Sequence, residues 1–147
     1  MGKYLLDTNA LISLIEKNDK VTKRFRREIL EEGTQFFTTS LNYYEYIRGI
    51  PGHRGDPRRR KLKEYLQKAV TVIHITDLKV IDQGGDIFRK LVIKGKKLKT
   101  KGDDDKEFPD DVDILTAAIS IQIKAVVVTH DPDFGKIDGV SSENWEK

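Results

Sequence analysis

Short apolar runs alternate along this chain with longer segments of helical periodicity. The apolar runs predict strands at residues 3–6, 35–38, 72–75 and 125–129. Apolar residues spaced three and four apart predict helices at residues 11–15, 21–32, 41–48, 58–69 and 77–93, with another from residue 113. Because strands and helices alternate, we expect one α/β domain over residues 1–147, with a central parallel β-sheet flanked by helices.

Residues that start or end helices mark several of these boundaries. Asn9 and Ser40 stand where their side chains can cap the first turn of a helix. Gly33 follows another helix, where a left-handed residue is easiest for glycine. The run from Val126 to Val128 does not alternate with polar residues, which is typical of a parallel strand covered on both faces.

The long helix at residues 77–93 has an apolar face, which we expect to pack inward. Its members are Leu78, Ile81, Phe88, Leu91 and Val92. From residue 113 the chain is apolar almost all round, as in a helix buried among other elements. Between these two helices, residues 94–111 are polar and break the pattern.

Composition narrows the class of protein. The chain has 27 Lys and Arg against 24 Asp and Glu, and this net charge of +3 excludes a histone-like polycation. Hydrophobic residues make up 37%, which is enough to cover a core and excludes a disordered polyelectrolyte. The absence of cysteine excludes thiol catalysis and cysteine-based metal sites, and favours the reducing cytoplasm. No apolar stretch is long enough to span a bilayer, so we expect no membrane partner.

Four acidic residues stand near the expected carboxyl ends of strands. Asp7 directly follows the first strand, and Asp131 lies two residues beyond the last. Glu45 is one turn into the helix after the second strand, and Asp113 opens the buried helix. Ligands of open parallel sheets bind beyond these strand ends, so the four carboxylates can converge there. Since unpaired carboxylates repel one another, a hard divalent cation such as Mg²⁺ or Mn²⁺ is the ordinary remedy.

Each acid alone also has a structural explanation. Asp7 and Asp113 can stabilise the N–H groups at the start of a helix, an effect worth about 0.5 to 2 kcal/mol. Glu45 alone reads as a surface glutamate, and Asp131 before Pro132 as the start of a turn. None of these roles predicts that all four acids fall on one side of the sheet.

The segments that contain these acids are residues 5–12, 40–49 and 113–118, together with residues 128–131 and Phe134. In this order they resemble the PIN-domain ribonucleases, and are most similar to VapC-type toxins of toxin–antitoxin pairs. The resemblance implies a Mg²⁺- or Mn²⁺-dependent endoribonuclease that leaves a 5′ phosphate and a 3′ hydroxyl. It implies a set of metal-binding and catalytic acids, Asp7, Glu45, Asp113 and Asp131. It also implies supporting polar residues, Thr8, Asn9 and Thr129.

Within this resemblance we expect three of the acids to hold the principal ion: Asp7, Asp113 and Asp131. Glu45 would orient water or a second ion. The chain departs from the family at Thr116, where alanine or isoleucine is common, and in its long polar stretch before the third acid. Asp110 and Asp111 are neighbouring candidates, but Asp111 is about 200° of helix away from Asp113 and cannot share its direction.

Two basic clusters are candidates for bringing RNA to an acidic site. The members are Arg58, Arg59 and Arg60 in one cluster and Lys96, Lys97 and Lys99 in the other. Solvated surface charge is the alternative for both. If either cluster binds phosphates, its neutralisation should weaken the salt dependence of binding to single-stranded RNA by about 0.7 log unit for each phosphate that is no longer neutralised.

Partners and biological role follow only from the resemblance. It implies an RNA substrate, a cognate antitoxin protein that covers the pocket, and a homodimer. A housekeeping PIN-domain RNA-processing nuclease, or a non-catalytic RNA-binding PIN module, remains the alternative. The four acids argue against an inactive site, but they do not separate a toxin from a housekeeping nuclease.

Overall fold

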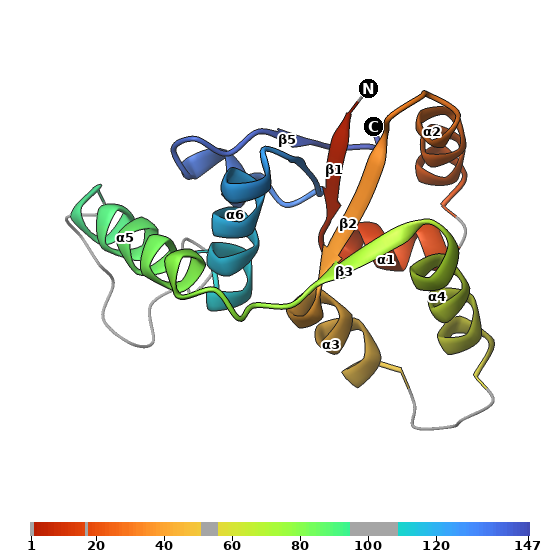
Figure 1. The fold of residues 1–147 in the computed structure, drawn as a ribbon, viewed down its shortest axis with the longest axis horizontal. Helices are drawn as coiled ribbons and strands as arrows, with labels where there is room; N and C mark the ends of the chain where they lie inside the picture. The colour runs from red at the N-terminus through yellow and green to blue at the C-terminus, as the bar shows by residue number, and fades with distance from the viewer. Residues whose placement is uncertain (1, 17, 51–55, 95–108) are drawn as a thin grey trace.

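The computed structural model describes residues 2–16, 18–50, 56–94 and 109–147 (Figure 1). Its elements follow in the order β1 (Lys3–Leu6), α1 (Thr8–Ile15), α2 (Asp19–Ile29), β2 (Gln35–Thr39), α3 (Ser40–Arg48), α4 (Pro57–Lys68), β3 (Val70–Ile73), α5 (Leu78–Lys94), α6 (Asp111–Ile123), β4 (Val126–Val128), η2 (Pro132–Lys136) and β5 (Ser142–Glu143). The short η2 is a 3₁₀ helix.

The five strands form one sheet in the order β3-β2-β1-β4-β5, and each neighbouring pair is parallel. Leu5 in the central strand β1 is in register with Phe37 on one side and Val127 on the other. The predicted α/β fold with a central parallel sheet is therefore confirmed. Because the strands are parallel, the carboxyl ends of β1, β2 and β4 meet at one edge.

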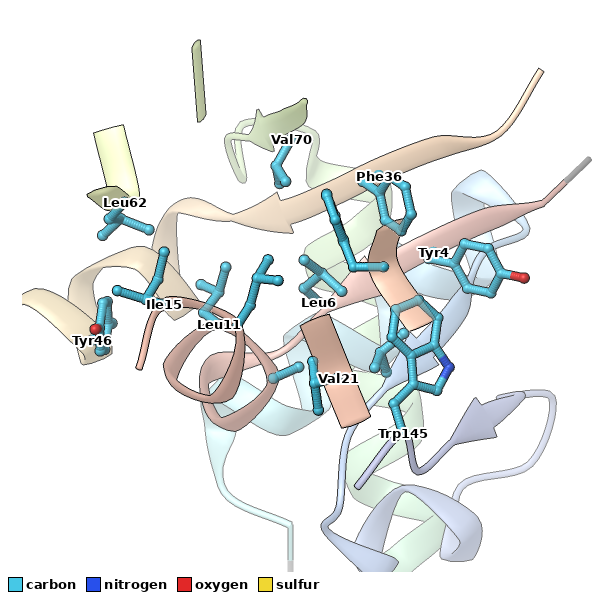
Figure 2. Packing of buried hydrophobic residues seen from close by; sticks show 14 of the residues in the cluster. Tyr4, Leu6, Leu11, Ile15, Val21, Phe36, Tyr46, Leu62, Val70 and Trp145 are labelled. Carbon is cyan, nitrogen blue, oxygen red and sulfur yellow. The ribbon is translucent and has the colours of Figure 1, made fainter. Parts of the chain in front are cut away.

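Helices cover both faces of the sheet. On one face, Leu6 and Val128 pack with residues of α1, α2 and α4 in a cluster that also contains Tyr4, Phe36 and Trp145 (Figure 2). On the other face, Leu5 and Val127 pack against α5 and α6. Figure 1 shows these two helix groups on opposite sides of the strands. The double coverage confirms what the unalternated valines of β4 predicted.

The inward face of α5 differs from the predicted one. Val80, Ile87 and Leu91 are buried against α6, whereas the side chains of Leu78, Ile81 and Phe88 are exposed. Gly84 lies on the inward face, where an added Cβ would stand 3.0 Å from Leu115 Cδ2. Leu91 was predicted to face inward and is buried, so the prediction is confirmed there and wrong for Leu78, Ile81 and Phe88. Apolar residues occur on both faces of α5, so periodicity alone did not select the buried one.

Several predicted boundaries shift by one to three residues. Asn9 lies inside α1, because the N-cap is Asp7, and Thr39 rather than Ser40 caps α3. The strand predicted at residues 72–75 is β3 at Val70–Ile73, and the helix predicted at 21–32 ends at Ile29. Gly33 has the expected positive φ of 80° but lies in the loop beyond that helix.

The strand β5 was not predicted, because it is two residues long and polar. Its position is fixed by the parallel ladder to β4 and by the residues that follow it. Trp145 is buried, with its ring 5.1 Å from that of Tyr4 and 6.3 Å from that of Phe36. The C-terminal segment is thus anchored over the amino-terminal half of β1. In the described ranges, no helix is both long and apolar enough to cross a membrane.

Two adjacent glycines of α5 test its orientation. Gly84→Val should lower the free energy of unfolding by about 1 to 3 kcal/mol relative to Gly85→Val, because only the former side chain meets α6. The two variants share the same change in helix propensity, so their difference in urea denaturation reports packing. Equal stabilities would contradict this orientation.

Candidate functional site

Asp7 sits at the end of the central strand and begins α1. Its Oδ1 accepts a hydrogen bond of 3.0 Å from the backbone N–H of Ala10, which makes it the N-cap of that helix. Its side chain is almost completely buried, since the residue is only 3% exposed. Burial raises the pKa of the Asp7 carboxyl from 3.8 to about 7, although a hydrogen bond with Thr129 and the one from Ala10 act in the opposite direction.

Asn9 connects the ends of β1 and β4. Its Nδ2 donates to Asp7 Oδ2 at 3.1 Å and to Thr129 Oγ1 at 3.2 Å, while its Oδ1 accepts from the backbone N–H of His130 at 3.1 Å. Thr129 Oγ1 also accepts from the backbone N–H of Asp131 at 3.0 Å. Two of the three residues predicted as supports, Asn9 and Thr129, therefore fix the position of Asp7 relative to the backbone of Asp131.

Asp131 begins η2 as its N-cap. Its Oδ1 accepts a hydrogen bond of 2.9 Å from the backbone N–H of Asp133. Asp131 therefore starts a turn, as its place before Pro132 suggested, and it is also one of the four acids of the predicted site. The neighbouring His130 turns away to a contact of 2.8 Å between its Nδ1 and Oε2 of Glu146.

Glu45 is held by the first residue of α1. Thr8 Oγ1 lies 2.7 Å from Glu45 Oε1 and 3.0 Å from Asn42 Oδ1, so one hydroxyl proton serves two acceptors. Glu45 Oε2 lies 3.6 Å from Arg48, one turn further along α3. Since Asn42 and Glu45 are three residues apart, they share the face of α3 that meets α1.

Behind Glu45 lies a buried polar contact between helices. The Nδ2 of Asn42 donates to Thr39 Oγ1 at 2.9 Å and to Thr116 Oγ1 at 3.2 Å, and all three residues are buried. These contacts join the end of β2, α3 and α6. The sequence reasoning missed Asn42 and Thr39, and it treated Thr116 only as a departure from the family pattern. The sequence did contain a signal for this contact. Thr39 is a residue type that caps helices, and Asn42 stands three residues later, at the position whose backbone N–H a cap accepts from.

Asp113 occupies the third position of α6 rather than its start. Asp110 is the N-cap, and its Oδ1 accepts from the backbone N–H of Asp113 at 2.9 Å. Asp111 is exposed, whereas Asp113 is half-buried. Burial, and after it the negative charges of Asp110 and other nearby carboxylates, raise the pKa of Asp113 from 3.8 to about 7.

The carboxylates that act on Asp113 are those of the predicted set: besides Asp110 they are Asp131, Asp7 and Glu45. The fold therefore brings four acids from the ends of β1 and β4 and from α3 and α6 close enough to repel one another. The electrostatic repulsion among these four carboxylates decreases when one of them is protonated or when a cation binds between them.

The donor set fits a hard divalent cation in its chemistry, because it consists of carboxylate oxygens. Among the described residues, however, no three acidic or histidine side chains stand close enough together to hold a metal ion. The carboxylates would therefore move together on binding. The raised pKa values of Asp7 and Asp113 fit this interpretation, since a cation would favour their charged forms.

The predicted cluster at Arg58 is not brought to the acids in the same way. Arg58 pairs with Asp56 at 2.9 Å and reaches Glu16 at 3.5 Å. Glu16 is the C-cap of α1, about 13 to 14 Å along that helix from its start at Asp7. The second cluster, Lys96, Lys97 and Lys99, lies outside the described residues. RNA binding by either cluster stays a prediction.

Sequence comparison gives one match to a known family. The family model described as "PIN domain" matches residues 4–140, which is nearly the whole chain. A search of curated proteins found no match.

Solved structures share this fold at low sequence identity. One such structure is VapBC2 from Rickettsia felis bound to a DNA fragment from its promoter. It is 21% identical to this chain with a TM-score of 0.75, over 97% of this chain and 98% of that chain. VapBC-1 from nontypeable Haemophilus influenzae is 22% identical with a TM-score of 0.73, over 99% of both chains. FitAcB from Neisseria gonorrhoeae is 19% identical with a TM-score of 0.66, over 97% of both chains.

The buried acids predict an unusual pH dependence of stability in metal-free buffer. Folded Asp7 and Asp113 keep their protons to about pH 7, whereas unfolded aspartates lose theirs near 3.9. The folded state then binds more protons in this window, so the free energy of unfolding should fall as pH rises from about 4 to about 7. Asp7→Asn keeps an oxygen for the cap and should raise stability above about pH 7 by roughly 1 to 4 kcal/mol.

Urea denaturation at several pH values measures this effect. Asp111→Asn is the matched control, because Asp111 is exposed on the same acidic edge of α6. It should keep the slope of the parent chain. The same slope in Asp7→Asn as in the parent would refute the assignment of a raised pKa to Asp7.

Proposed function

The chain belongs to the PIN domain family, and on this basis we propose that it is a metal-dependent endoribonuclease. The observation that carries the proposal is the set of four mutually repelling carboxylates at one edge of the sheet, two of them with pKa values raised to about 7. Such a set, in which Asp7 is buried and the other three acids are partly buried, is costly for stability and is typical of a functional site. The proposed catalytic acids are Asp7, Glu45, Asp113 and Asp131.

In this proposal Asp7, Asp113 and Asp131 hold a Mg²⁺ or Mn²⁺ ion, and Glu45 orients the attacking water or a second ion. A bound divalent cation lowers the pKa of water and offsets charge on phosphate oxygens. Hydrolysis would leave a 5′ phosphate and a 3′ hydroxyl. Because Asp7 and Asp113 keep their protons to about pH 7, cation binding should release protons near neutral pH.

Neutral side chains have the supporting role. Asn9 and Thr129 fix the carboxylate of Asp7 relative to the backbone of Asp131. Thr8 holds one oxygen of Glu45 and leaves the other facing Arg48. These contacts restrict the rotamers of the acids before substrate or cation arrives, which reduces the cost of organising the site.

We further propose that the chain is the toxin component of a VapBC-type pair in the cytoplasm. Its fold likeness to VapBC complexes supports this role. The partners would be a cognate antitoxin and a second copy of the chain. Exposed apolar side chains on α5, Leu78 and Phe88 among them, offer surface for such protein contacts. A housekeeping PIN-domain nuclease or a non-catalytic RNA-binding module is the alternative, and the retained acids favour a nuclease over the module.

One pair of variants in the same helix tests the catalytic proposal. Asp113→Asn should lower the rate of RNA cleavage by roughly 100-fold or more, since loss of a supporting residue alone typically costs about 10- to 100-fold in metal sites. Asp111→Asn makes the same chemical change two residues away on the exposed side and should keep its activity. Cleavage of labelled RNA with Mg²⁺ and with Mn²⁺ measures both. Full activity of Asp113→Asn would remove the proposed site.

Expression tests the toxin role separately from the chemistry. Induction of the chain in a bacterial host should arrest growth, and co-expression of the protein encoded by the adjacent gene should relieve the arrest. Asp113→Asn should not arrest growth, because the arrest depends on cleavage. RNA cleavage in vitro without growth arrest would favour the housekeeping nuclease.

A further inference from the structure

A row of basic side chains lies along α2, on a part of the chain that the sequence reasoning did not single out. Lys20, Lys23, Arg24 and Arg27 are spaced three and four residues apart, so they share one face of the helix. Together with Lys147 they line a groove of about 390 Å³ between α2 and the C-terminal segment. We call this surface the α2 groove. From Lys20 to Arg27 it extends about 10 Å along the helix.

The charges in the α2 groove are only partly balanced. Arg24 pairs with Glu28 at 2.6 Å and Glu143 at 3.3 Å, and Arg27 shares Glu28 at 3.2 Å. Two glutamates thus face five cations. The three lysines make no ion pair with any residue in the described ranges. Their ammonium groups are therefore available to an anion.

Arg24 has a structural role in this groove. Its guanidinium lies 5.1 Å from the centre of the Trp145 ring, as well as between the two glutamates. Because it is held by these three contacts, Arg24 fixes the C-terminal segment against α2. The lysines on either side of Arg24 therefore lie on two segments that are fixed against each other.

The α2 groove adjoins a small hollow that reaches a residue in contact with Asp7. Asn144 and Trp145 line both the groove and a small adjoining hollow, and the other wall of that hollow contains Asn9, Thr129 and His130. Asn9 is the residue that donates to Asp7. The groove and the acidic site are therefore linked through the hollow between them, by way of Asn144 and Trp145 on one side and Asn9 on the other.

We propose that the α2 groove binds the phosphate backbone of the single-stranded RNA substrate and leads it to the acids. This inference rests on the proposed ribonuclease function and adds the surface that would hold the substrate. The groove extends about 10 Å along α2, which is longer than a single phosphate group, so more than one phosphate can be contacted. Lysines contact phosphates as point charges, and the indole of Trp145 is covered by Arg24, so binding should be independent of base sequence.

The experiment uses the full chain with Asp113→Asn, which should prevent cleavage, and fluorescein-labelled poly(U) RNA as the probe. In this background Lys20, Lys23 and Lys147 are replaced by Gln, and affinity is measured by fluorescence anisotropy over a range of salt. The slope of log affinity against log salt should become shallower by about 0.7 for each phosphate that is no longer neutralised, and so by up to about 2 for three phosphates. All three lysines are exposed, so the fold should be unaffected.

Two control variants accompany this triple variant. Lys63, Lys79 and Lys90 replaced by Gln remove the same charge from exposed positions on α4 and α5 and should leave the slope unchanged. Replacement of Lys20, Lys23 and Lys147 by Arg keeps the charge and should also keep the slope.

An unchanged slope in the first triple variant, or an equal change in the α4 and α5 control, would overturn the inference. Weakened binding of poly-glutamate with an unchanged RNA slope would also overturn it and assign the groove to an acidic protein. The cleavage assay on the chain without substitutions separates these outcomes from a failure of the proposed function. RNA cleavage with an unchanged slope rejects only the groove. A reduced slope without any cleavage rejects the nuclease.

Discussion

The burial of the Asp7 carboxyl at the end of the central strand is the constraint on which the site depends. The parallel sheet places this carboxyl between the ends of β2 and β4, where the residue is only 3% exposed. Its ionisation there is opposed by burial, and ionisation of Asp113 is opposed by burial and by its acidic neighbours. A fold selected only for stability would replace such groups with neutral ones. Their presence makes sense if a cation completes the site.

The neutral residues around the acids explain how this arrangement is kept in place. Asn9 joins the ends of two strands, and Asn42 joins two helices through hydroxyl groups. These amides use their hydrogen-bonding capacity without adding charge, so they do not quench the negative potential of the edge. The three lysines of the α2 groove, which make no ion pair with any residue in the described ranges, lie on a different surface. The chain's small net charge of +3 therefore hides two regions of opposite sign.

The fold and the convergence of the acids could be predicted from the sequence, because both follow from alternating strands and helices and from parallel strand ends. Details that depend on a choice between two adjacent residues, or two helix faces, of similar character could not be predicted. Thr39 and Ser40 can both cap a helix, so their order in the sequence does not identify the cap. The helix α5 has apolar residues on two faces, and only packing against Leu115 decides which face turns inward. The α2 groove depends on Trp145 and β5, whose position no local pattern reveals.

Carbon-13 NMR titration of the aspartate carboxyl groups, with and without Mg²⁺, measures whether burial and a bound cation control the ionisation of these acids. Without the cation, the carboxyls of Asp7 and Asp113 should titrate near pH 7, well above the ordinary value near 4. With Mg²⁺, both pKa values should fall, because the cation favours the charged carboxylate, while the pKa of exposed Asp111 should change little. Ordinary pKa values without the cation, or values that Mg²⁺ does not move, would contradict the account.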